Sequence, residues 1–320
     1  MSTRERRERS NESDRFLTEL FHKAAKVHNG IDSGKEIALA AVGGYGRGEL
    51  SPGSDLDILF LHSGRVDSEL LKSLVNDVLY PLWDKKSVDH SVRTRSETRD
   101  AANSDLRVAT GLLDIRLICG NSDLVANVKS DSLDFWRRNA KDNLVSLRKS
   151  LQDRHARAGE LAYLLEPDLK EARGGLRDIQ ALRAISLTGV VTVPLEKISW
   201  AEATLNNVRE SLHIASGRGK DRLLFQEQDK VASLLKYSDA DAMMSDVARA
   251  ARSVDFLLNY TWHALEHKAS DGISRILRRD RVATVAKNVS ASNREISIDP
   301  LNSLDKILSL DYVPRQQLPN

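Results

Sequence analysis

Apolar residues recur with two different periods along this chain, and the change of period divides it into two parts. Residues 13–28 place apolar side chains at helical spacing, and 37–42 form a continuous apolar run of the length of a buried strand. Apolar residues at 56, 58 and 60 fall on one face of a strand, whereas Asp55 and Asp57 fall on the other. Residues 67–83 return to helical spacing, and 87–93 alternate apolar and polar positions. This order predicts a small mixed α/β unit in which helices separate the core strands.

Beyond about residue 125 nearly every segment has the helical period. The predicted helices cover 131–158, 175–187, 196–215, 222–236 and 240–268. We therefore expect an α+β protein with a small mixed-sheet domain over residues 1–125 and an all-helical domain over residues 126–270. Residues 271–320 alternate polar and apolar positions around Pro300 and Pro314, and we expect a weakly structured or truncated end there.

Composition narrows the class of protein without giving a function. The chain has 320 residues and 41% hydrophobic content, which is enough for a packed core in each part. Its 48 lysines and arginines nearly balance its 46 aspartates and glutamates, so the net charge of +2 gives no reason to expect a nucleic-acid partner. Cys119 is the single cysteine, which excludes an intrachain disulfide. No apolar run approaches the ~20 residues of a membrane span, and we expect a soluble, cytoplasmic protein with no membrane partner.

The most distinctive chemistry lies in residues 42–57. Gly43, Gly44 and two further glycines follow the first apolar run, and such glycines let backbone N–H groups approach phosphate oxygens. Asp55 and Asp57 share one face of the second predicted strand, because side chains alternate along a strand. Two carboxylates that point the same way from a rigid element are a usual preparation for Mg²⁺. The turn lacks both the Walker sequence and the spacing of a dinucleotide-binding fingerprint.

A glycine turn followed by Asp-x-Asp resembles the DNA polymerase beta-type nucleotidyltransferases. Within that superfamily, four spaced motifs make the chain similar to the bacterial PII-protein uridylyltransferases. The first motif combines residues 43–50 and 54–57, and the other three are residues 90–94, 166–170 and 174–178. The likeness extends to residues 221–225 and Gln228. The resemblance covers about residues 35–265 and implies a polymerase beta-like domain followed by a helical domain.

The resemblance implies roles for individual residues. Asp55 and Asp57 would be metal ligands for Mg²⁺, and Gly43, Gly44 and Ser54 would cradle the β- and γ-phosphates. Arg47 would support the turn or reach a phosphate, although a structural ion pair explains it equally well. In the later loop, Lys170 and Arg177 would contact the triphosphate or the base, and Arg173 stands where the family commonly has proline, which should loosen the turn.

A third carboxylate usually comes from a neighbouring strand in this superfamily, and Asp89 on the third predicted strand is the candidate. Asp105 and Asp114 are the fallback ligands, although both fit a helix cap or a salt bridge better. Asp89 stands where uridylyltransferases more often have glycine and where related glutamine synthetase adenylyltransferases have aspartate. The resemblance as a whole implies UTP as the nucleotide, and Asp89 leaves ATP as the alternative.

The function implied by the resemblance is transfer of UMP from UTP to a tyrosine of the nitrogen-regulatory PII protein, with release of pyrophosphate. Whether Asp89 or the metal takes the tyrosine proton stays open. One rival is an adenylyltransferase that acts on PII or glutamine synthetase, and another is a degenerate module that only binds PII or nucleotide. The family continues into a phosphohydrolase domain with a His-Asp doublet and two ACT domains. This sequence has no His-Asp doublet, so we expect a transferase without uridylyl-removing activity or glutamine control.

Overall fold

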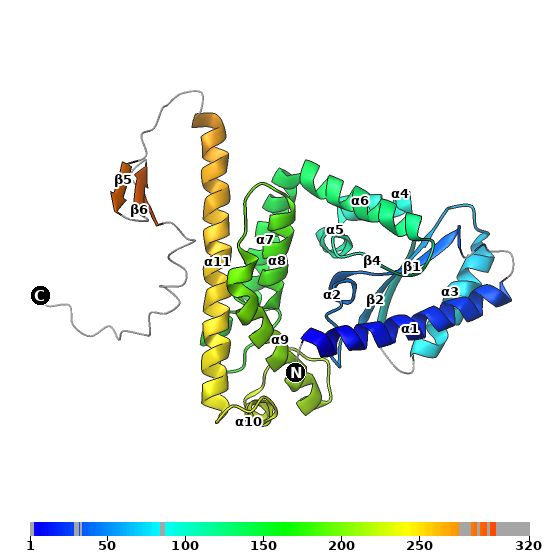
Figure 1. The fold of residues 1–320 in the computed structure, drawn as a ribbon, viewed down its shortest axis with the longest axis horizontal. Coiled ribbons are helices and arrows are strands. Elements are labelled where there is room, and N and C mark those ends of the chain that lie inside the picture. Colours follow the sequence, from blue (N-terminus) through cyan, green and yellow to red (C-terminus); the bar gives the residue numbers. More distant parts are fainter. Residues whose placement is uncertain are drawn as a thin grey trace, which may run out of the picture.

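The computed structural model describes residues 3–28, 32, 34–83, 87–274, 283–286, 289–292 and 295–298. The first part is built on a four-stranded sheet (Figure 1). Its elements are α1 (Thr3–Val27), β1 (Ile37–Ala41), α2 (Gly43–Gly46), β2 (Leu56–His62), α3 (Ser68–Trp83), β3 (Val88–Thr94), α4 (Arg95–Ser104), α5 (Leu106–Leu112) and β4 (Arg116–Gly120). The strand order is β3-β2-β1-β4, in which β1 runs antiparallel to β2 and β4 and β2 runs parallel to β3.

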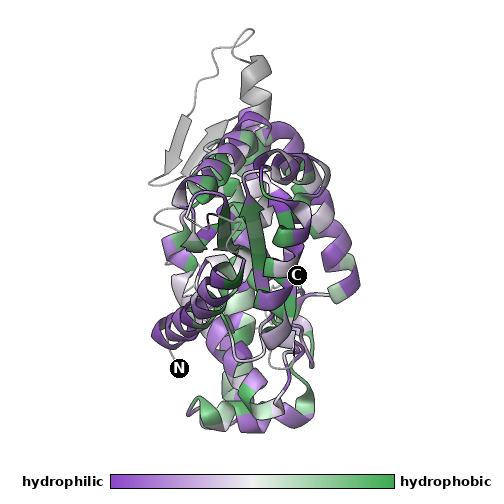
Figure 2. Ribbon diagram, turned by 90° about the vertical axis from the view of Figure 1, so that its right-hand side faces the viewer, coloured by the Kyte–Doolittle hydropathy of each residue, from purple (hydrophilic) through white to green (hydrophobic). Residues whose placement is uncertain are grey.

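Each face of the sheet packs on a different hydrophobic layer. Leu39, Ile58 and Phe60 point to the layer that α1 and α3 form, and Ala40 and Leu59 point to the opposite layer. The second layer contains apolar side chains from α4, α5 and α6 (Ser122–Arg138) and continues without a break into the helical part. In Figure 2 the strands in the middle of the molecule are largely green and the helix at the N-terminus is largely purple, in agreement with this burial. Odd-numbered positions of β2 therefore face the helical part.

The remaining helices form the second part of the molecule, with α11 along one side (Figure 1). They are α7 (Ala140–Ala158), the short 3₁₀ helix η1 (Leu161–Tyr163), α8 (Leu176–Leu187), η2 (Leu195–Ile198), α9 (Ser199–Ser216), α10 (Phe225–Leu234) and α11 (Ala240–Ser274). Helix α9 contacts α8, α10 and α11. The predicted fold class, a small mixed sheet followed by helices, is confirmed, and the predicted helix over 131–158 divides at Asn139 into α6 and α7.

Two elements differ from the sequence-based expectation. Helix α1 begins at Thr3 rather than near residue 13, because Arg6 and Ser10 in its first turns are buried in the fold. The strand β4 was not expected at all, and α6 begins directly after it at Ser122. The boundary expected near residue 125 therefore falls inside the first turn of α6, which packs on the sheet.

The C-terminal prediction falls mainly outside the described residues. Within 271–320 the structure describes the last turn of α11 and three short strands, β5 (Ala283–Ala286), β6 (Val289–Ser292) and β7 (Glu295–Ile298). These strands pair antiparallel in the order β5-β6-β7. None of the helices in the described part of the chain combines the length and the apolar character that a bilayer crossing requires.

Candidate active site

The glycine turn lies against the carboxylate of Asp57. The backbone N–H of Val42 donates to the carbonyl of Asp57 at 3.1 Å, which ties the end of β1 to the start of β2. Gly43 has φ +55°, and a Cβ placed on it would lie 3.4 Å from Asp57 Oδ2. A Cβ on Gly46 would lie 2.1 Å from the carbonyl oxygen of Asp114, which leaves no space for a side chain. The turn therefore requires glycine where it passes closest to its neighbours.

Asp57 and Asp89 are directly paired on the parallel strands β2 and β3. Paired residues of neighbouring strands point to the same face, so the two carboxylates are neighbours on the side of the helical part. Burial raises the pKa of Asp57, and the negative charges of Asp89 and Asp55 raise it further. Among the residues that the structure describes, no three carboxylate, imidazole or thiol groups form a ready-made metal cage. The carboxylates thus bring negative charge together, but within the described residues they do not form a closed set of metal ligands by themselves.

Arg47 lies in an ion-pair network. Its guanidinium donates to Glu49 at 2.7 Å and to Asp114 at 2.5 Å, and its side chain is 13% exposed. Glu49 also accepts from Arg183 of α8 at 3.1 Å, and Arg183 donates to Glu202 of α9 at 2.5 Å. Of the two roles left open by the sequence, this position corresponds to the structural ion pair.

Asp105, Asp114 and Ser54 have local partners as well. Asp105 caps α5 by accepting from the backbone N–H of Arg107 at 2.7 Å, and Asp114 is the partner of Arg47. Ser54 closes the turn before Asp55, because its Oγ accepts from the backbone N–H of Ser51 at 3.0 Å. The structure therefore places Ser54 beside the Asp-x-Asp pair and engages Asp105 and Asp114 elsewhere.

The loop over residues 166–178 is held in place at both ends. At its start, Asp168 Oδ1 accepts from the backbone N–H of Lys170 at 2.9 Å. The N–H of Leu169 donates to the carbonyl of Asp221 at 2.9 Å, which joins this loop to the segment that follows α9. These backbone contacts give the loop a defined conformation rather than that of a solvated turn.

The end of the loop is fixed by a buried carboxylate. Asp178 is fully buried and accepts from the backbone N–H of Gly174 at 2.7 Å, from Arg154 at 2.5 Å and from His155 at 2.9 Å. Burial alone would raise the pKa of Asp178, but His155 and Arg154 lower it. Gly174 has φ +85°, and a Cβ there would lie 2.5 Å from the carbonyl oxygen of Ala251 in α11.

The expectation that Arg173 loosens this turn is wrong. Its Nε donates to Asp255 of α11 at 2.7 Å, and its Nη1 lies 3.3 Å from Glu160 Oε1. The longer side chain forms two ion pairs that proline could not form, and it joins the loop to α11 and to the residue that precedes η1.

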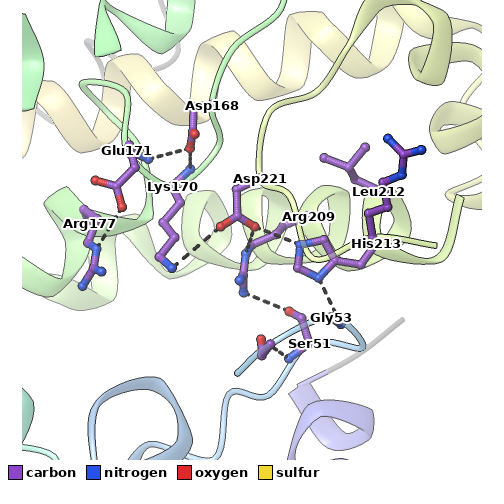
Figure 3. Close-up of polar contacts among 12 residues, drawn as sticks. Ser51, Gly53, Asp168, Lys170, Glu171, Arg177, Arg209, Leu212, His213 and Asp221 are labelled. Atoms are coloured by element: carbon purple, nitrogen blue, oxygen red, sulfur yellow. Dashed lines mark hydrogen bonds and ion pairs between the residues drawn. The ribbon is translucent and has the colours of Figure 1, made fainter. Parts of the chain in front are cut away.

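The same loop brings two cations into the field of the aspartates. The charges of Lys170 and Arg177 both lower the pKa of Asp57, in opposition to burial and to the other carboxylates. Lys170 Nζ lies 3.7 Å from Asp221 Oδ2, and Arg177 Nε lies 3.2 Å from Glu171 Oε1 (Figure 3). Lys170 and Arg177 thus lie near Asp57, although they are more than 100 positions from it in the sequence.

Sequence reasoning missed the polar face of α9. Arg209 and His213 point from this helix toward Asp221 on one side and toward Ser51 and Gly53 on the other (Figure 3). The available signal was the recurrence of polar residues at 202, 206, 209, 210 and 213 within a segment of helical period.

Comparison with known families agrees with this geometry. A glycine turn beside paired aspartates on a mixed sheet is the arrangement of a nucleotidyltransferase, and residues 29–108 match the family described as nucleotidyltransferase domain. Residues 143–189 and 192–262 match the family described as GlnD PII-uridylyltransferase. The chain therefore carries a nucleotidyltransferase domain followed by a domain of the GlnD PII-uridylyltransferase family, which confirms the resemblance seen in the sequence.

Curated relatives carry the name bifunctional uridylyltransferase/uridylyl-removing enzyme. One from Streptomyces coelicolor is 47% identical over 251 residues, which is 78% of this chain and 29% of the relative. One from Mycobacterium tuberculosis is 36% identical over 275 residues, 82% of this chain and 33% of the relative. One from Stutzerimonas stutzeri is 37% identical over 232 residues, 67% of this chain and 25% of the relative. The chain thus spans about a quarter to a third of the length of these relatives.

Proposed function

We propose that this chain transfers UMP from UTP to a tyrosine hydroxyl of the PII signalling protein and releases pyrophosphate. The observation that carries the proposal is the pairing of Asp57 with Asp89 beside Gly43, with Lys170 and Arg177 within electrostatic reach. Carboxylates on one side and cations on the other suit a ligand that brings both a metal ion and phosphate oxygens. The names of the relatives support the uridylyl group as the one transferred.

Asp55, Asp57 and Asp89 are the residues that would hold Mg²⁺. They fit such an ion, because burial and the neighbouring carboxylates disfavour the charge on Asp57 in its absence. Mg²⁺ is usually held by a few carboxylates together with substrate phosphates rather than by a closed protein cage, which agrees with the open arrangement of these side chains. When bound, the ion would neutralise negative charge on the triphosphate.

The chain's own residues would position the two reactants. Gly43 and Gly44 on the glycine turn and Ser54 before Asp55 would receive the β- and γ-phosphates. Lys170 and Arg177 would face the triphosphate from the helical part. The tyrosine oxygen would then attack the α-phosphorus as the bond to pyrophosphate breaks. Asp89 is exposed at the edge strand β3, so its carboxylate is also accessible to the tyrosine proton.

The mass of PII after incubation with the chain tests this function. With Mg²⁺ and UTP we expect one uridylyl group per modified PII subunit, and no modification by the Asp57→Asn chain. An adenylyl group from ATP instead of a uridylyl group would identify an adenylyltransferase, the rival favoured by Asp89. Binding of PII or nucleotide without any transfer would identify a degenerate binding module.

A further inference from the structure

Asp221 joins the cationic side of the candidate site to helix α9. Its Oδ1 accepts from Arg209 Nε at 2.5 Å and from His213 Nε2 at 2.9 Å, and its Oδ2 lies 3.7 Å from Lys170 Nζ (Figure 3). The carboxylate is 11% exposed and His213 is fully buried. One carboxylate thus holds three nitrogen-bearing side chains, of which Lys170 also acts electrostatically on Asp57.

Arg209 and His213 continue from Asp221 to the turn that precedes Asp55. Arg209 Nη1 donates to Ser51 Oγ at 3.0 Å, and the backbone N–H of Gly53 donates to His213 Nδ1 at 3.4 Å (Figure 3). Ser51, the acceptor, and Gly53, the donor, both belong to the turn over residues 51–54, which ends directly before Asp55. The position of this turn therefore depends on the orientation of the two α9 side chains.

The two contacts of His213 indicate one tautomer of its ring. Because Nδ1 accepts from Gly53, the ring proton is on Nε2, which donates to Asp221. The segment after α9 also contacts this turn through its backbone, because a Cβ on Gly219 would lie 2.1 Å from the carbonyl oxygen of Gly53. The turn is thus held by directional bonds and by close backbone packing on the same side.

We propose that Asp221 is a positioning residue for the transferase proposed above. It holds Lys170 on the cationic side of the site and, through Arg209 and His213, the turn over residues 51–54 that leads into the aspartates. A single buried carboxylate would then set the distance between the phosphate-facing cation and the metal-binding carboxylates. The proposal depends on the proposed function only for its kinetic consequence, whereas its structural consequence is measurable without any activity.

Hydrogen–deuterium exchange of the turn tests the structural consequence. In the Asp221→Asn chain we expect backbone amides over residues 51–55 to exchange about tenfold faster, the order of magnitude for one lost hydrogen bond. Asp246→Asn is the matched control, because Asp246 also pairs with an arginine in the helical part, but it accepts from Tyr237 and Arg249 rather than from side chains that reach the turn. Unchanged exchange over 51–55 in the Asp221→Asn chain would overturn the proposal.

A double-mutant cycle tests the kinetic consequence. If Asp221 acts through Lys170, Asp221→Asn should raise the KM for UTP about tenfold in the wild-type background and much less in a Lys170→Ala background. A merely structural role for Asp221 would give equal effects in both backgrounds and would overturn this arm. Arg209→Lys is the milder variant if Asp221→Asn does not fold, since it keeps the charge but shortens the reach to Ser51.

The two readouts separate this inference from the proposed function. Faster exchange of the turn in a chain whose wild type transfers no nucleotide would leave the positioning role intact and remove the transferase assignment. If the wild type transfers UMP but the variants show no change of exchange or coupling, the transferase assignment stands and the positioning role of Asp221 is removed.

Discussion

Asp57 is the residue at which folding and the proposed chemistry oppose each other. Its carboxylate is partly buried, and the negative charges of Asp89 and Asp55 add repulsion to the cost of burial. Lys170 and Arg177 offset only part of this, because the pKa of Asp57 stays above its usual value. The charge on Asp57 is thus unfavourable in the free protein, although the residue lies beside the glycine turn. Such a charge is expected at a functional site, where a bound metal ion would stabilise it.

The first prediction follows from this opposition. Asp57→Asn should reduce uridylyl transfer by more than about 100-fold. Replacing a residue that only supports a metal ligand reduces activity by up to about 100-fold, and replacing the ligand itself should cost more. In metal-free buffer the same substitution should leave the melting temperature unchanged or raise it, because it removes a charge that the fold disfavours. Thermal unfolding and the PII mass assay measure the two effects. A lower melting temperature together with retained transfer would contradict both.

Arg47 has the opposite character, because its charge is satisfied by the fold. Arg47→Ala would leave the largely buried carboxylates of Glu49 and Asp114 without their main partner, and we expect a loss of about 3–5 kcal/mol in the free energy of unfolding. Urea denaturation measures this loss. The KM for UTP of the folded fraction should not change, and a large rise in that KM with little loss of stability would instead identify Arg47 as a phosphate contact.

At the scale of elements, the loop over residues 166–178 is decided by backbone geometry. Gly174→Ala would place a Cβ 2.5 Å from the carbonyl oxygen of Ala251 at φ +85°, so loop and α11 must separate. We expect a loss of at least about 2 kcal/mol in unfolding free energy, measured by urea denaturation, and weaker nucleotide binding. Gly111→Ala in α5 is the control, because its Cβ meets nothing within 4 Å, and it should be neutral or slightly stabilising.

Sequence periodicity predicted most elements because their packing is local and regular. Strands β1, β2 and β3 and the helices after residue 131 follow the spacing of their apolar residues. Strand β4 was missed because it has only five residues, too few for a clear alternation. The first turns of α1 were missed because their stability comes from distant partners, such as Glu210 for Arg6.

Only part of the candidate site could be predicted from the sequence. Asp55 and Asp57 could be found from alternation, and the resemblance added Asp89, Lys170 and Arg177. The contacts of Asp221 could not be found, because they join three segments that are remote in sequence and depend on the relative position of sheet and helices. Such long-range polar contacts leave no periodic signal in one sequence.

At the scale of the whole molecule, polar contacts fix how the sheet and the helical part meet. Glu210 of α9 is fully buried and pairs with Arg6 at 3.2 Å and with Arg9 of α1. Arg183 joins α8 to Glu49 beyond the glycine turn, and Arg209 reaches Ser51. Directional bonds of this kind define one orientation of the two parts, whereas the continuous apolar layer beneath them supplies adhesion without direction.

Acid should weaken this arrangement over a defined pH range. Burial alone would raise the pKa of Asp221, but His213, Arg209 and Lys170 lower it to about 2, against a usual value of 3.8. A carboxyl whose pKa is lower in the folded state contributes stability above its unfolded pKa and loses it as pH falls. Asp221 should therefore contribute roughly 2 kcal/mol at neutral pH and lose this contribution between about pH 4 and pH 2.

Urea denaturation at a series of pH values measures that contribution. The unfolding free energy of the wild type should fall more steeply between pH 4 and pH 2 than that of Asp221→Asn, so that the two curves converge at the acid end. Asp57→Asn provides the contrast, because the raised pKa of Asp57 gives it the opposite sign: that variant should gain on the wild type as pH rises through the carboxyl range in metal-free buffer. Parallel curves for wild type and Asp221→Asn would mean that the carboxylate of Asp221 is not held by its three cationic or donor neighbours in solution.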